Sequence, residues 1–187
     1  MQQSNNTALL VMDFQKAVLQ RLEDPAKILQ KMAKAIAHAR SNGIPVIYVV
    51  VSFRPGAPEI GNRNKSFSAY NNKEMWTPAF LSEWEQILPE IQPENDEVVV
   101  TKRRYSAFTG SDLEVVLRAK NIQHMVLTGI STSGVVLSTL REAADKDYQL
   151  TVIADCCEDR DTEVHRVLTT KVFSAQAEVI DLDAWIK

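Results

Sequence analysis

The sequence predicts an α/β fold, a three-layer α/β/α sandwich around a mostly parallel sheet of six strands with Rossmann-like topology. Short apolar segments alternate along the chain with segments whose apolar residues recur at helical spacing. Residues 45–52 (PVIYVVVS) are continuously apolar and β-branched, as in a strand buried on both faces. Residues 124–159 indicate a strand, a sharp turn, a helix and a second strand, which together form a βαβ crossover.

The first half of the chain supplies three of the expected strands. A helix between the first two begins at Asp24 and Pro25 and ends at Gly43, because proline favours the first helical turn and glycine the position after the last. A further short helix is expected over 80–91. The three strands are expected at residues 8–12, 45–52 and 97–101.

The second half supplies the other three strands and the remaining helices. A helix is expected from Gly110 and Ser111 to near Asn121, another from near Ser133, and a third over 161–172. In the helix after Ser133, the residues expected on the buried face are Val136, Leu140, Ala143 and Ala144. The strands are expected at residues 124–130, 148–155 and 177–182.

Length and composition are those of an ordinary globular domain. The 187 residues suit one domain spanning 1–187, with 45% hydrophobic and 24% charged residues. A net charge of −3 gives no reason to expect nucleic acid or an anionic membrane as a partner. No apolar run is long enough to span a membrane, and the N-terminus lacks a signal-peptide pattern. We therefore expect a cytoplasmic protein.

Cysteine and histidine give no indication of a disulfide scaffold, a metal or a cofactor. Cys156 and Cys157 are adjacent, lack a metal-ligand spacing, and are expected to be small buried side chains beyond the strand that ends at 155. His38, His124 and His165 are scattered over separate elements and are expected to be packing or surface residues. We expect neither a metal nor a cofactor.

Residues 53–78 have no sustained hydrophobic period. The segment contains several prolines, glycines and asparagines with scattered aromatic residues. A long irregular segment in a compact domain is commonly a functional loop or lid, and the alternative is a surface excursion without a role. We expect it to shape any pocket that lies beside it.

Three chemically useful features follow expected strands. Asp13 follows the first strand, Lys102 follows the strand at 97–101, and small residues at 131–134 open the helix after the strand at 124–130. The carboxyl ends of parallel strands share one sheet edge, so these features converge if their strands are neighbours. A helix N-terminus there can bind an anion or an oxyanion. The alternative is a plain salt bridge between Asp13 and Lys102.

Motifs over almost the whole chain resemble the isochorismatase-like hydrolases, also called cysteine hydrolases. The motifs are ALLVMDFQ, KRRYSAFTGSDLEVVLRAKNI, LTGISTSGVVLSTLREAADKDYQLTVIADCCED and the segment that ends at His165. The resemblance implies a catalytic triad of an aspartate after the first strand, a lysine after a later strand, and a cysteine at the start of the central helix. Asp13 and Lys102 match the first two positions.

The third position departs from the family pattern, which looks like G-V-x-T-x-x-C-V. Val135 stands where the cysteine is expected, and valine can neither lose a proton nor form a thioester. True isochorismatases resemble this pattern with glycine at that position and are thought to use the aspartate as an acid. Gly134 is one residue away, so the sequence leaves open a displaced glycine or a valine beside a glycine. Ser131 or Ser133 could replace the thiol, although no histidine is placed to activate either.

These features together predict a hydrolase that acts on a vinyl ether or an amide C–N bond of a small molecule. Asp13, positioned by Lys102, is expected to act as general acid or base beside the backbone N–H groups of Ser131 and Val135. The resemblance implies a cis peptide between Ile130 and Ser131. The residues expected to line the pocket are Phe14, Gln15, Tyr105, Phe108, Thr132, Ser133 and Gly134.

Two questions stay open at this level. The alternative to catalysis is a disarmed family member that binds a small ligand or a partner, which Val135 favours and the retained Asp13 and Lys102 disfavour. Arg103, Arg104 and Tyr105 form either a rim that attracts a carboxylate substrate or a solvated loop. Similarity to relatives also implies a homodimer or a higher homo-oligomer.

Overall fold

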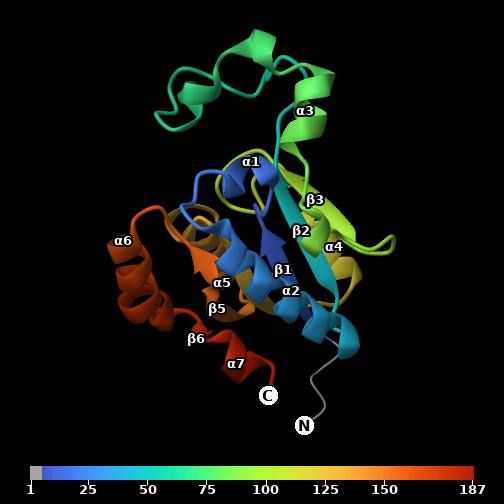
Figure 1. Cartoon of the computed structure of the whole chain (residues 1–187), viewed down its shortest axis with the longest axis vertical. Helices are drawn as coiled ribbons and strands as arrows, with labels where there is room; N and C mark the ends of the chain where they lie inside the picture. Colours follow the sequence, from blue (N-terminus) through green and yellow to red (C-terminus); the bar gives the residue numbers. More distant parts are fainter. Residues whose placement is uncertain (1–5) are drawn as a thin grey trace.

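A computed structural model describes residues 6–187 and contains one fully parallel sheet of six strands (Figure 1). The strand order is β3-β2-β1-β4-β5-β6, which is the order of a doubly wound sheet with its reversal between β1 and β4. The prediction of six strands is confirmed. The strands are β1 Thr7–Met12, β2 Val46–Val51, β3 Val98–Lys102, β4 His124–Ile130, β5 Gln149–Glu158 and β6 Glu178–Ile180.

Helices cover both faces of the sheet, so the three-layer prediction is also confirmed. One apolar cluster packs α4 and α5 against the sheet, and a second packs α2 and α7 against the opposite face. No helix among residues 6–187 is long and apolar enough to cross a membrane. The helices are α1 Lys16–Leu19, α2 Pro25–Ser41, α3 Pro78–Trp84, α4 Leu113–Ala119, α5 Leu137–Asp145, α6 Thr162–Val167 and α7 Leu182–Trp185.

Strand β1 is central and fully buried, which explains its uninterrupted apolar sequence. Leu10 and Met12 point into the cluster with α5, whereas Leu9 and Val11 point into the cluster with α2. Successive side chains of a strand point to opposite faces, and both faces are covered here. The strand therefore ends at a fixed place in the middle of the sheet edge, where Asp13 follows.

The structure corrects the expected limits of several elements. The helix expected from near Ser133 begins at Leu137, after a π-helical turn over Thr132–Val136. The helix expected over 80–91 ends at Trp84; residues 86–88 form an extended link with a bridge between Gln15 and Ile87, and a 3₁₀ turn covers Pro89–Ile91. Strand β5 extends to Glu158 and its register shifts against β4. Cys156 and Cys157 therefore lie inside β5, one in each apolar cluster. The short helices α1 and α7 were not anticipated.

The irregular segment 53–78 extends from the end of β2, away from the sheet (Figure 1). Only two 3₁₀ turns, Phe67–Tyr70 and Lys73–Met75, interrupt it, as the absence of a hydrophobic period predicted. Its aromatic residues form a third apolar cluster together with α3. The segment therefore has its own small core and can form a firm wall beside the sheet edge.

Candidate active site

An ion pair lies at the carboxyl ends of β1 and β3. Lys102 Nζ is 2.9 Å from Asp13 Oδ2, and the two side chains are only 2% and 9% exposed. Asp13 has a φ of +58°, and its N–H donates to the Val49 carbonyl at 2.8 Å. Lys102 Nζ also donates to the Arg104 carbonyl at 2.8 Å. The backbone and Lys102 therefore hold the Asp13 carboxylate in one orientation.

The second oxygen of Asp13 has no hydrogen-bond partner among the described residues, although it is buried. Burial raises the pKa of Asp13, and the positive charge of Lys102 opposes that rise. A buried acceptor without a partner is costly unless a ligand or water satisfies it. The arrangement suits a carboxyl group that exchanges a proton with a bound molecule.

The turn between β4 and α5 lies beside this pair, at the point where the strand order reverses. The peptide bond between Ile130 and Ser131 is cis, as the resemblance implied. A π-helical turn over Thr132–Val136 follows, and the Ser131 carbonyl accepts from the N–H groups of Gly134 and Val136. A Cβ atom at position 134 would lie 2.6 Å from Ser131 Oγ. A larger residue at position 134 would therefore require the Ser131 hydroxyl to rotate away.

Two side chains brace the outer side of the turn. The carboxylate of Asp159 accepts from the Ser133 N–H at 2.7 Å, and the Thr132 hydroxyl is 2.8 Å from His165 Nδ1. Burial lowers the pKa of His165. Both groups come from the end of β5 and from α6, so this part of the chain holds the turn in place.

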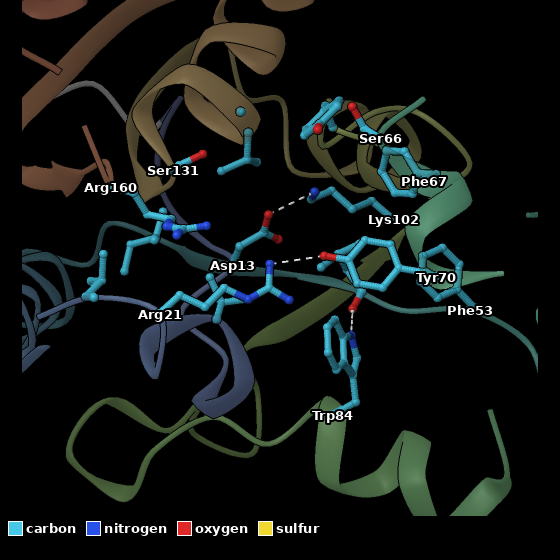
Figure 2. A pocket seen from close by; sticks show the side chains of 17 residues that line it. Asp13, Arg21, Phe53, Ser66, Phe67, Tyr70, Trp84, Lys102, Ser131 and Arg160 are labelled. Carbon is cyan, nitrogen blue, oxygen red and sulfur yellow. Dashed lines mark hydrogen bonds and ion pairs between the residues drawn. The ribbon is translucent and has the colours of Figure 1, made fainter. Parts of the chain in front are cut away.

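The Asp13–Lys102 pair and the turn face one pocket with a volume of about 210 Å³ (Figure 2). The pocket lies at the switch point of the sheet, where doubly wound folds bind ligands. The pocket is lined by six residues that were expected in the site from the sequence: Asp13, Lys102, Tyr105, Ser131, Gly134 and Val135. Convergence of the three strand ends, predicted from the parallel sheet, is therefore observed.

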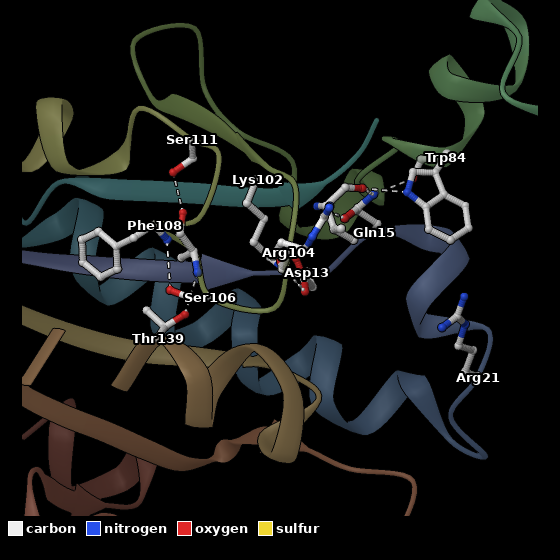
Figure 3. Close-up of polar contacts among 12 residues, drawn as sticks. Asp13, Gln15, Arg21, Trp84, Lys102, Arg104, Ser106, Phe108, Ser111 and Thr139 are labelled. Carbon is white, nitrogen blue, oxygen red and sulfur yellow. Dashed lines mark hydrogen bonds and ion pairs between the residues drawn. The ribbon is translucent and has the colours of Figure 1, made fainter. Parts of the chain in front are cut away.

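Phe14 and Gln15 do not line this pocket. Phe14 is buried in the apolar cluster with α2. The Gln15 amide donates to the carbonyls of Val51 and Trp84, and its oxygen accepts from the Val51 N–H (Figure 3). Gln15 thus ties the ends of β1, β2 and α3 together, and its hydrogen-bonding groups are used within the chain.

The pocket is also not lined by Phe108, Thr132 or Ser133. Phe108 packs in the apolar cluster with α4 and α5. Thr132 is fully buried and turned toward His165, and the Ser133 side chain is exposed. Thr132 and Ser133 lie at the start of the π-helical turn, where their contacts with His165 and Asp159 set their orientation.

Sequence reasoning missed the two arginines of the pocket, Arg21 and Arg160. Arg103 and Arg104, the arginines expected at a pocket rim, bind backbone carbonyls instead. Arg103 donates to the Ser52 carbonyl and Arg104 to the Glu59 carbonyl. Of that rim, only Tyr105 lines the pocket. No spacing in the sequence links Arg21, just after α1, to Arg160, just after β5.

Neither cysteine of the chain lies in the pocket. Cys156 and Cys157 are buried in β5, and burial raises the pKa of both thiols, that of Cys157 to about 12. A thiol with such a pKa is a poor nucleophile. Residues 6–187 also hold no group of three or more metal-ligating side chains.

Comparisons with known proteins agree with this geometry. The family model described as Isochorismatase domain matches residues 7–184. The uncharacterised isochorismatase family protein YwoC of Bacillus subtilis (strain 168) is 30% identical over 167 residues, which cover 89% of this chain and 85% of that protein. The ureidoacrylate amidohydrolase RutB of Pseudomonas savastanoi pv. phaseolicola is 30% identical over 169 residues, covering 80% and 69%.

Solved structures show the same fold. An isochorismatase family protein from Burkholderia thailandensis superposes with a TM-score of 0.83 at 27% identity, over 96% of this chain and 93% of that one. N-carbamoylsarcosine amidase from Thermoplasma acidophilum gives 0.76 at 27% identity, over 95% and 97%. By family match, sequence similarity and fold, this chain belongs to the isochorismatase family of hydrolases.

Proposed function

We propose that this hydrolase cleaves a small molecule by acid–base chemistry at Asp13, without a covalent thiol intermediate. The observation that carries the proposal is the buried Asp13 carboxylate, whose Oδ2 pairs with Lys102 while Oδ1 has no partner among the described residues and the side chain lines the pocket. A raised pKa leaves more of this group protonated than an ordinary aspartate at the same pH. Asp13 can therefore serve as a proton donor.

Hydrolysis of a vinyl ether needs only a proton donor and water, and it suits this site best. Protonated Asp13 gives its proton to the outer carbon of the double bond, which leaves an oxocarbenium ion. Water adds to that ion and returns a proton to Asp13, and the hemiketal then breaks into a carbonyl compound and an alcohol. Lys102 stabilises the Asp13 carboxylate between these two steps.

Hydrolysis of an amide C–N bond is the second reaction that the site could support. Asp13 would then act first as a base on water, and the N–H groups of Ser131 and Val135 would stabilise the oxyanion. The amine leaves only after it receives a proton, which Asp13 would supply. Two relatives named as amidases or amidohydrolases favour testing this bond type as well.

Ligand binding without catalysis is the competing function. It is favoured by one observation, the valine side chain at position 135 where the resemblance implies a nucleophile. In that case the pocket would keep its shape and charge but not turn over its ligand. The retained acid–lysine pair is the argument against it.

The test is turnover by the purified protein and by Asp13→Asn on isochorismate, nicotinamide, ureidoacrylate and N-carbamoylsarcosine. Asp159→Asn is the matched control, because Asp159 is also a buried aspartate at the end of a strand but does not line the pocket. Activity that is lost in Asp13→Asn and kept in Asp159→Asn supports acid–base catalysis. No turnover by the natural chain, together with amidase activity in Val135→Cys, would contradict catalysis by Asp13 and support the ligand-binding alternative.

A further inference from the structure

The pocket is cationic although the chain as a whole is acidic. Its charged lining residues are one carboxylate, Asp13, and three cations, Arg21, Lys102 and Arg160, whereas the chain carries a net charge of −3. Lys102 is paired with Asp13, so the two arginines form the excess of positive charge. A surplus of positive charge in a partly enclosed pocket attracts an anion.

Arg21 is held in place by aromatic groups. Its guanidinium donates to the Tyr70 hydroxyl at 3.0 Å, and its Cζ atom lies 5.9 and 5.8 Å from the ring centres of Tyr70 and Trp84. A guanidinium carries five N–H donors, and only one is used in this hydrogen bond. Arg21 is exposed, and these contacts orient its guanidinium with donors left for a ligand.

Arg160 is the second cation, and it lies on the same side of Asp13 as Arg21 (Figure 2). It follows the end of β5 and is exposed. Within residues 6–187 it has no ion pair within 4.0 Å, whereas the exposed Arg166 of α6 pairs with Glu163 at 2.6 Å. An arginine that lines a pocket without a counter-charge is available to a bound anion.

One wall of the pocket is aromatic and adjoins Arg21. Phe67 packs edge-to-face on Tyr105 at 5.2 Å between ring centres, and Phe53 packs on Phe67 at 6.1 Å. Tyr70 and Trp84 complete the wall. Such a surface favours a flat or cyclic apolar body, because rings pack well on aromatic faces and edges.

We propose that Arg21 and Arg160 form an anion subsite that binds the carboxylate of a small planar or cyclic substrate. The ring of that substrate packs on the aromatic wall and its scissile bond faces Asp13; this last placement rests on the proposed function, whereas the anion subsite does not. The guanidinium fork matches the two oxygens of a carboxylate in one plane. Arg21 and Arg160 are thereby specificity residues.

Binding of benzoate and of its neutral isostere benzamide tests the subsite without turnover. Both are titrated into the natural chain and followed by NMR, with the amide signals of Ser131 and Gly134 as reporters of the pocket. We expect benzoate to bind at least tenfold more tightly than benzamide, since a charge-assisted hydrogen bond changes affinity by about that factor or more. Equal binding of the two probes would overturn the proposal.

Single variants assign the effect to the arginines. Arg160→Gln is expected to weaken benzoate binding about tenfold and to leave benzamide binding unchanged. Arg166→Gln, an exposed arginine outside the pocket, is the matched control and should change neither. Arg21→Gln should act like Arg160→Gln, although it also removes the Tyr70 contact. Unchanged benzoate affinity in Arg160→Gln would overturn the subsite.

Two further arms separate the subsite from the catalytic proposal. Asp13→Asn should keep or strengthen benzoate binding, because it removes a negative charge from the pocket, even if it abolishes turnover. Inorganic phosphate is the competing anion. Tighter binding of phosphate than of benzoate at the same reporters would overturn the assignment to a carboxylate.

Discussion

Asp13 and Asp159 are two buried aspartates at the same edge of the sheet, and they differ in what remains unpaired. Asp13 follows β1, pairs with Lys102 through Oδ2, and leaves Oδ1 without a partner among the described residues. Asp159 follows β5 and accepts from the Ser133 N–H through Oδ2 and the Asp161 N–H through Oδ1. Asp13 therefore has one oxygen that can accept a hydrogen bond from a ligand. Both oxygens of Asp159 already accept hydrogen bonds from backbone N–H groups.

This difference shows that position at a strand end does not by itself leave a carboxylate oxygen available to a ligand. Both carboxylates lie where a doubly wound fold binds ligands, yet only Asp13 lines the pocket. The hydrogen-bond partners of the two carboxylates, and not their positions, distinguish them. Asp13 is suited to proton transfer, and Asp159 to positioning the turn.

The largest expected effect follows loss of the Asp13 carboxyl group. Asp13→Asn should lower kcat by about 10²- to 10⁴-fold on whichever substrate the natural chain turns over, which is the usual contribution of a general acid or base. Asp159→Asn should change kcat by less than about tenfold, since an amide oxygen can still accept from Ser133. Steady-state kinetics measures both, with circular dichroism as the check of folding. Similar losses in the two variants would remove the distinction between them.

A second prediction concerns the pH dependence of turnover. Because burial raises the pKa of Asp13, acid catalysis should decline with rising pH in a range above the ordinary aspartate value of 3.8. Lys102 lowers that pKa, so Lys102→Met should move the declining limb to higher pH. Profiles of kcat against pH for both proteins test this. A limb that moves to lower pH in Lys102→Met would contradict the assigned electrostatics.

Lys31→Met is the matched control for the second prediction. Lys31 pairs with Asp155 at 2.8 Å outside the pocket, so its loss also breaks an ion pair. The pH profile of this variant should coincide with that of the natural chain. A shift equal to that of Lys102→Met would show that the effect is not local to Asp13.

Loss of the Asp159 carboxylate should affect stability more than chemistry. Asp159→Ala leaves the Ser133 N–H without its acceptor, and we expect the free energy of unfolding to fall by about 1–3 kcal/mol. Chemical denaturation measures this change. The pH profile of turnover should keep its shape, because Asp13 is untouched. A changed profile would place Asp159 in the chemistry after all.

The smallest effect is expected at His165. His165→Gln removes the contact with the Thr132 hydroxyl and should cost about 0.5–1.5 kcal/mol at neutral pH. Burial lowers the pKa of His165 below 6.5, so the unfolded chain binds more protons there and stability falls as the pH decreases below that value. The variant should show a shallower loss of stability with acid. An unchanged slope in denaturation at pH 5 to 7 would contradict this.

The amino-acid pattern alone determined the fold class and the two charged residues at the strand ends. Continuous apolar runs predicted buried parallel strands, and a parallel sheet places Asp13, Lys102 and the turn at one edge. The hydroxyl residues at 131–133 predicted a helix start near Ser133, where the structure has a π-helical turn that leads into α5 at Leu137. These features depend on the spacing of nearby residues and on the direction of the strands, and both can be predicted from the amino-acid sequence.

Only the tertiary structure decided which side chains face the pocket. Gln15 and Thr132 were expected there but are turned toward partners that lie far away in the sequence, at Val51, Trp84 and His165. Arg21 and Arg160 are brought together although 139 positions separate them. The direction of a side chain depends on the turn geometry and on hydrogen bonds to distant elements. No local pattern encodes these, so only the folded structure shows that Arg21 and Arg160 line one pocket.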